Sequence, residues 1–79
     1  MIHNINIWTV QWIEIDKTGA EAVIVELHLS YESAKSRVDE LFNITSAELE
    51  AIRGYATNLI SSSISISAFF ITPSLHDEP

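Results

Sequence analysis

The sequence predicts a two-layer α+β domain in the order ββααβ, with a three-stranded, mainly antiparallel sheet and a helix pair packed on one face. Three observations support this class. Two β-branched, apolar segments flank a turn, two amphipathic segments with helix-capping residues follow, and a stretch of alternating Ser and Ile comes last. We expect one globular domain over residues 1–72 and a disordered acidic tail over residues 73–79.

The first two strands are expected to form a hairpin around the sequence DKTG, residues 16–19. Asp16 can accept hydrogen bonds from the backbone that follows it, and Gly19 can adopt a positive φ. This turn permits two registers. A three-residue loop with a bulge pairs Asp16 with Ala20, whereas a four-residue loop pairs Ile15 with Ala20.

The side-chain pattern favours the four-residue loop, because a slip of one residue exchanges the two faces of a strand. The three-residue loop would place both tryptophans beside Glu26 and His28. The four-residue loop instead gathers large apolar residues on one face, namely Trp8, Val10, Trp12, Val23, Val25, Leu27 and Leu29. We therefore predict that Trp8 and Trp12 lie under the helices.

Two helices are expected to follow the hairpin. Ser30 is a suitable N-cap for the first, and apolar residues recur after it at spacings of three and four. Thr45 and Glu48 match a capping box, which predicts a second helix over residues 46–61. Gly54 would lie inside this helix. Its buried stripe is expected to be Leu49, Ile52, Ala56, Leu59 and Ile60.

The sequence SISISAFFIT, residues 63–72, predicts the third strand. Ile64, Ile66 and Ala68 would share one face with Phe70. The strand could pair antiparallel with the second strand or parallel with the first. We favour the antiparallel pairing.

Composition disfavours several classes of function. Eleven acidic residues against four basic ones give a net charge of −7, which disfavours direct binding to nucleic acid or to anionic membranes. The chain has no cysteine, no signal-peptide pattern and no apolar run of the ~20 residues that a membrane span needs. We expect a cytoplasmic protein.

The pattern of polar residues predicts neither a cofactor nor a metal site. His3, His28 and His76 are far apart, and no metal-binding spacing links them. Glu26 and His28 alternate onto one strand face, where a carboxylate can orient an imidazole as a base. No nucleophile motif accompanies them, so we interpret them as a solvated polar face and expect no enzymatic activity.

The sheet face that the helices leave uncovered is the predicted binding surface. In the favoured register it carries apolar residues among small polar ones, which suits a protein partner or a second copy of the chain. The predicted partner-binding residues are Ile7, Thr9, Gln11, Ile13, Ile24, Glu26, His28, Phe69 and Ile71.

The helices offer a second candidate surface, because their carboxylates can imitate nucleic-acid phosphates. Lys35, Arg37 and Arg53 interrupt it, so a solvated helix face is the simpler interpretation. The acidic residues of this surface are Glu32, Asp39, Glu40, Glu48 and Glu50.

These features predict a small acidic protein that acts by binding another protein. In size, acidity and lack of cysteine, the chain looks like small phage-encoded inhibitors of host defence, such as anti-CRISPR proteins. No motif carries this resemblance, so it assigns no residues. It implies a basic nucleic-acid-handling complex as the target, blocked sterically or by acidic mimicry. The alternative is a homodimeric accessory or small-ligand-binding domain that uses the outer sheet face.

Overall fold

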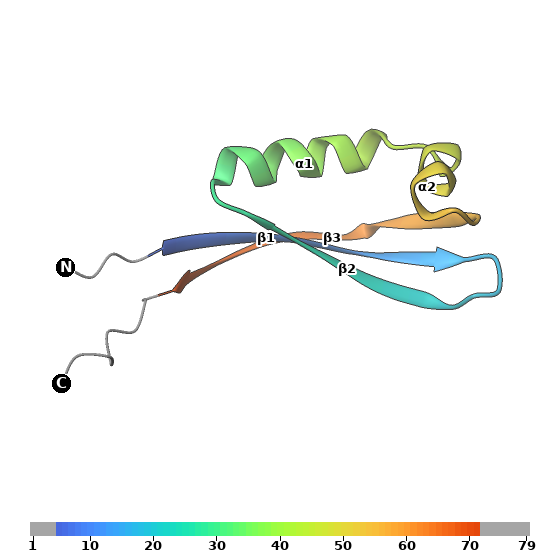
Figure 1. Ribbon diagram of the computed structural model, residues 1–79, viewed down its shortest axis with the longest axis horizontal. Coiled ribbons are helices and arrows are strands. Elements are labelled where there is room, and N and C mark those ends of the chain that lie inside the picture. The colour runs from blue at the N-terminus through green and yellow to red at the C-terminus, as the bar shows by residue number, and fades with distance from the viewer. Residues whose placement is uncertain (1–4, 72–79) are drawn as a thin grey trace.

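A computed structural model describes residues 5–71. Its elements are β1 (Ile5–Asp16), β2 (Glu21–His28), α1 (Tyr31–Asn43), α2 (Ser46–Arg53) and β3 (Thr57–Ile71). The strands form one antiparallel sheet in the order β2-β1-β3, and both helices lie on the same face of it (Figure 1). The predicted class, element order and helix pair are therefore confirmed. The predicted tail, His3 and His76 lie outside the described residues.

The hairpin turn has the three-residue loop, so the register favoured by the side-chain pattern is wrong. The Asp16 N–H donates to the Ala20 carbonyl at 2.9 Å, and the Gly19 N–H donates to the Asp16 carbonyl at 3.0 Å. Gly19 has a φ of 89°, as a bulge of this kind requires. The Asp16 carboxylate also accepts from the N–H groups of Thr18 and Ala20. Turn chemistry, rather than the sorting of faces, sets the register.

This register moves every side chain of β2 to the face opposite the predicted one. Trp12 lies opposite Ile24, and Val10 lies opposite Glu26. The β2 residues on the helix-covered face are therefore Ile24, Glu26 and His28. The residues on the uncovered face include Val23, Val25 and Leu27, which are 65%, 51% and 68% exposed.

The core lies where β1 meets the helices, as its alternating pattern predicts. Val10 and Trp12 are fully buried there against Ala34 and Leu41 of α1. Trp8 packs at the margin of this core, and its ring meets that of Tyr31 edge-on at 5.0 Å between centroids. The prediction that both tryptophans lie under the helices is confirmed. It holds although the predicted hairpin register is wrong, because both registers leave the faces of β1 unchanged.

The second helix ends at Arg53 rather than at residue 61. Gly54 is its C-cap, with a φ of 83° and an N–H that donates to the Glu50 carbonyl at 2.7 Å. Glycine is the usual residue at such a left-handed cap, so Gly54 terminates the helix instead of lying inside it. Leu59 and Ile60 consequently belong to β3, and Ile52 is exposed.

The third strand pairs antiparallel with β1, so neither of the predicted pairings occurs. The chain returns along the sheet in α1, but α2 has only eight residues and does not return it again. The third strand therefore starts at the hairpin end and runs in the same direction as β2 (Figure 1). Neither helix within residues 5–71 is long and apolar enough to cross a membrane.

A bulge interrupts β3 opposite Trp12. Gln11 pairs with Ser65 whereas Ile13 pairs with Ile60, so residues 61–64 of β3 lie opposite a single residue of β1. The Ile13 N–H donates to the Ser63 hydroxyl at 2.8 Å, and this hydroxyl donates to the Ile60 carbonyl. Ser63 thus supplies the acceptor that the bulge removes from the backbone ladder.

Ser63→Ala is expected to lower the free energy of unfolding by about 1–3 kcal/mol, because it leaves the partly buried Ile13 N–H without an acceptor. Urea denaturation measures the change. Ser62→Ala is the matched control, since Ser62 lies in the same bulge but is exposed. Equal losses in the two variants would contradict a specific role for the Ser63 hydroxyl.

Candidate functional site

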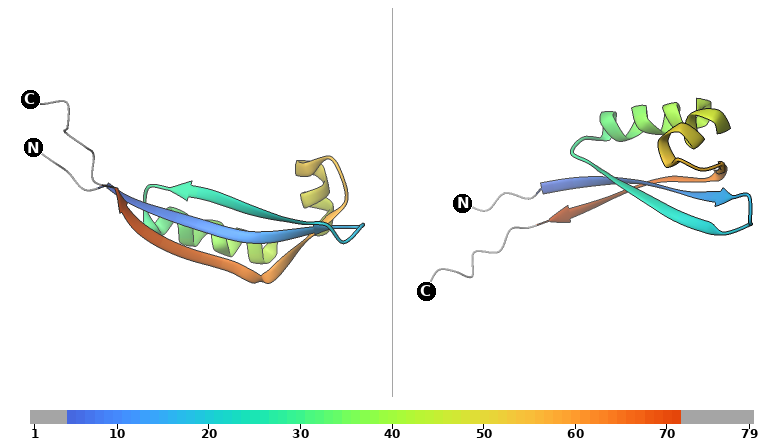
Figure 2. Two further views of the ribbon diagram at one scale, coloured as in Figure 1. Left: turned by 90° about the horizontal axis from the view of Figure 1, so that it is seen from below. Right: turned by 45° about the vertical axis from the view of Figure 1, so that its right-hand side comes forward.

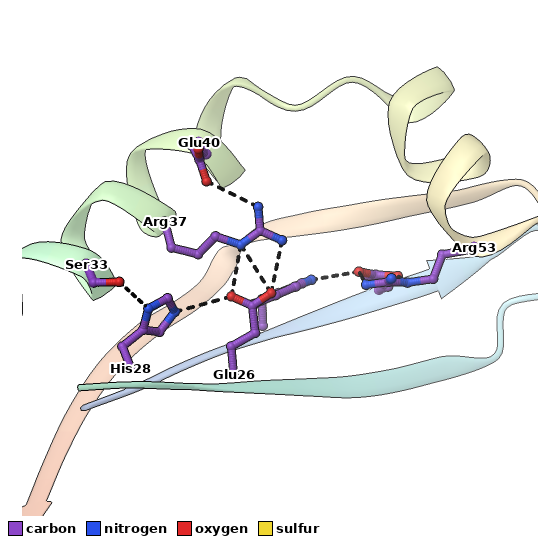
Figure 3. A network of polar contacts seen from close by, with 8 residues as sticks. Glu26, His28, Ser33, Arg37, Glu40 and Arg53 are labelled. Carbon is purple, nitrogen blue, oxygen red and sulfur yellow. Dashed lines mark hydrogen bonds and ion pairs between the residues drawn. The ribbon is translucent and has the colours of Figure 1, made fainter. Parts of the chain in front are cut away.

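Polar contacts link the helices to the covered face of the sheet (Figure 3). The side chains that make these contacts come from strands β1 and β2, from helix α1 and from the end of helix α2. The residues labelled in the figure are Glu26, His28, Ser33, Arg37, Glu40 and Arg53.

The most buried of these contacts joins Glu14 of β1 to Arg53 of α2. Glu14 is 3% exposed, and its two carboxylate oxygens accept from Arg53 Nε at 2.7 Å and Arg53 Nη2 at 2.6 Å. The indole N–H of Trp12 donates to the same carboxylate at 2.8 Å. Burial raises the pKa of Glu14, but the hydrogen bonds from Arg53 and Trp12 and the nearby positive charges outweigh it. They hold this pKa below its ordinary value of 4.5.

The second contact joins Arg37 of α1 to Glu26 of β2. Arg37 Nε lies 2.9 and 3.1 Å from the two carboxylate oxygens, and Nη2 lies 3.0 Å from Oε2. Arg37 also contacts Glu40 at 3.3 Å, and its guanidinium lies 5.6 Å from the ring centre of Trp12. Hydrogen bonding to Glu26 raises the pKa of Arg37. The pair therefore fixes α1 to the edge strand and covers Trp12.

His28 lies between a carboxylate and a hydroxyl. Its Nε2 is 3.3 Å from Glu26 Oε1, and its Nδ1 is 2.8 Å from Ser33 Oγ. Carboxylate, imidazole and hydroxyl in this order match the relay by which hydrolases activate a serine. The structure thus brings together the predicted pair of Glu26 and His28 and adds Ser33 to it.

The surroundings of this relay favour a structural role. Glu26 is already neutralised by Arg37, and Ser33 lies in the first turn of α1, where its N–H donates to the Oγ of the N-cap Ser30 at 3.1 Å. A surface hollow of about 390 Å³ lies at the hairpin end of the molecule, beside Lys17 and Tyr55, whereas His28 lies at the other end of the β1–β2 ladder. Within the described chain, no three His, Cys, Asp or Glu residues are grouped as metal ligands.

The predicted binding residues divide between the two faces of the sheet. Ile24, Glu26 and His28 lie on the covered face, because the hairpin register differs from the favoured one. Ile71 pairs with Ile5 at the end of the sheet. The predicted residues on the uncovered face are Ile7, Thr9, Gln11, Ile13 and Phe69.

The uncovered face is more apolar than the sequence predicts. Figure 2 (left) looks onto this face, with the three strands in front of α1. Ile7 and Thr9 of the central strand are buried between their neighbours, so the accessible apolar surface lies beside them. We call it the outer patch, formed by Ile13, Val23, Val25, Leu27 and Phe69.

The acidic surface lies on the other side of the molecule from the outer patch. All five of its carboxylates are carried by the helices and are exposed, and Glu40 is paired with Arg37. Because the helices cover only one face of the sheet (Figure 1), a single flat partner cannot contact both surfaces. The structure separates the two predicted binding surfaces. The acidic residues are Glu32, Asp39, Glu40, Glu48 and Glu50.

Sequence reasoning missed the role of Glu14, Arg37 and Arg53, although two of them carry a readable signal. Glu14 continues the alternation of Val10 and Trp12 onto the covered face, where a charge needs a partner. Arg37 follows Ala34 by three residues, on the buried side of α1. Arg53 ends α2, and only its position above Glu14 reveals its role.

Comparison with known protein families, curated proteins and solved structures found no match.

Proposed function

We propose that the protein is a non-enzymatic module that binds another protein through the outer patch. The observation that carries this proposal is the row of Val23, Val25 and Leu27, each more than half exposed on the same face of one strand. Phe69 extends the apolar surface on the opposite edge strand. Exposed apolar side chains gathered on one face of a small domain are typical of protein interfaces.

The target that best fits the whole molecule is a nucleic-acid-handling complex. A partner bound to the outer patch would leave the helices, with their exposed carboxylates, facing the solvent. In a chain of net charge −7, that layer would repel phosphates approaching the bound complex. The protein would thus block nucleic acid sterically and by repulsion, in the manner of small phage-encoded inhibitors of host defence. Direct imitation of nucleic acid by the helices is the less favoured mechanism.

Phe69→Asp is expected to weaken the binding and inhibition of such a complex by tenfold or more, as the loss of one interface anchor does. The assay is nucleic-acid cleavage by a panel of purified CRISPR effector complexes. Phe42→Asp is the matched control: it makes the same change at a similarly exposed phenylalanine, but on α1. Circular dichroism checks that both variants remain folded.

Two results would contradict this proposal. If wild-type protein inhibited no complex of the panel, the inhibitor assignment would fail. If Phe42→Asp abolished inhibition while Phe69→Asp kept it, the helix face would be the contact surface.

A further inference from the structure

The two edges of the sheet differ in a way that matters for association. An edge strand presents unpaired backbone N–H and C=O groups, and proteins protect such edges with bulges, prolines or lysines. The edge strand β3 is interrupted by its bulge at residues 61–64. The edge strand β2 pairs with β1 without interruption over eight residues, and it contains neither proline nor lysine.

The backbone groups that β2 leaves unpaired follow from the hairpin turn. Backbone bonding alternates along an antiparallel pair, and Asp16 is hydrogen-bonded to Ala20. Every second residue after Ala20 therefore bonds to β1, and the residues between them point their backbone groups away from it. The outward-pointing residues include Val23, Val25 and Leu27, whose side chains also form the outer patch.

We propose that two copies of the chain pair antiparallel through β2 about a two-fold axis at Val25, which joins their two sheets into one. Val25 then pairs with itself across the axis, and Val23 pairs with Leu27 of the second copy. Each apolar side chain of this row thus meets another apolar side chain. This dimer rests on the edge of β2 and not on the proposed binding of a target.

The side chains of β2 select this axis over its neighbours, because only an axis at Val25 pairs Val23, Val25 and Leu27 entirely among themselves. An axis at Glu26 would place two carboxylates directly opposite each other, which destabilises a strand pair. An axis at Ile24 would place Glu21 opposite Leu27. About Val25, Glu26 faces Ile24 of the second copy, and the two Glu26 carboxylates meet only diagonally. Each is already held by its own Arg37, so the charges near the axis cancel.

The dimer would also enlarge the binding surface. The apolar rows of the two copies lie side by side on the same face of the joined sheet, so the two outer patches become continuous. A target would then meet a surface with two-fold symmetry.

Single cysteines test both the dimer and its axis, because the chain has no cysteine of its own. Val25→Cys is expected to form a disulfide-linked dimer under mild oxidation. The Cα atoms of a hydrogen-bonded strand pair lie about 5.5 Å apart, within the range of a disulfide. Val23→Cys is the matched control, because its two copies would lie four residues out of register, about 14 Å apart along the strand. Mixing Val23→Cys with Leu27→Cys should restore the crosslink.

Light scattering of the unmodified protein provides a test that needs no variant. We expect a mass that rises with concentration from 8.8 kDa to twice that value. A mass that stays at one chain at every concentration would overturn the dimer, as would equal crosslinking of Val25→Cys and Val23→Cys. Phe69→Asp should leave the mass unchanged, so loss of target binding in that variant is distinguishable from loss of the dimer.

Discussion

Trp12→Ala should lower the free energy of unfolding by about 3–5 kcal/mol, the usual cost of removing a large aromatic side chain from a core. Trp12 is 1% exposed and lies at the centre of the core between β1 and α1. Its indole also donates to the buried Glu14 carboxylate and lies under the Arg37 guanidinium. The substitution therefore removes packing and a hydrogen bond together.

Urea denaturation followed by circular dichroism measures this loss. Trp12→Phe separates the loss of packing from the loss of the hydrogen bond, because phenylalanine keeps much of the ring volume but has no N–H to donate. It should cost less than Trp12→Ala, and it gives a readable value if the alanine variant is unfolded. Phe42→Ala is the control for an exposed aromatic side chain outside the outer patch and should change stability little. A loss of less than 1 kcal/mol for Trp12→Ala would contradict the packing described above.

Arg53→Met should also cost about 3–5 kcal/mol, because it leaves the carboxylate of Glu14 buried without its counter-charge. Glu14→Gln should cost less, since the side chain of Arg53 that it leaves behind reaches the solvent more than Glu14 does. A double variant, Glu14→Leu with Arg53→Met, should recover much of the stability, because no charge is then buried.

The pH dependence of these variants distinguishes a lost ion pair from lost packing. In the wild type, the pKa of Glu14 lies below 4.5, so its contribution to stability is present above pH 4.5 and is lost as pH falls through the folded-state pKa. Without Arg53, the pKa of Glu14 should be higher than in the wild type, because burial is then opposed only by Trp12 and Arg37, and the variant is penalised only while Glu14 is charged. The stability difference between wild type and Arg53→Met should therefore be large at neutral pH and shrink on acidification. A difference independent of pH would indicate that Arg53 acts by packing alone.

The sequence predicted β1 correctly because its own alternation determines which residues it buries. Trp8, Val10 and Trp12 share a face in either register of the hairpin. The faces of β2 depend on a single residue of the turn, and the sorting of polar from apolar residues gave the wrong choice. That sorting assumed that Glu26 and His28 prefer solvent, whereas Arg37 and Ser33 provide partners for them under the helix.

The candidate binding surface was predicted in part, because the residues that β2 contributes to it depend on the same hairpin register. The uncovered face was identified, but its most exposed apolar residues were assigned to the core. The end of α2 was missed because Gly54 was interpreted as an unfavourable residue inside a helix. A glycine nine residues after the N-cap Thr45 is equally compatible with a left-handed C-cap, and only the three-dimensional path of the chain decides between the two.

The placement of the outer patch and the acidic helices on opposite sides has a consequence for association kinetics. Long-range attraction to a basic target acts on the carboxylates, so it turns the helices, not the sheet, toward the target during approach. A complex formed through the sheet must then form against that preferred orientation. Its association rate gains little from electrostatic steering and depends weakly on ionic strength, whereas contact through the helices would be fast and strongly suppressed by salt.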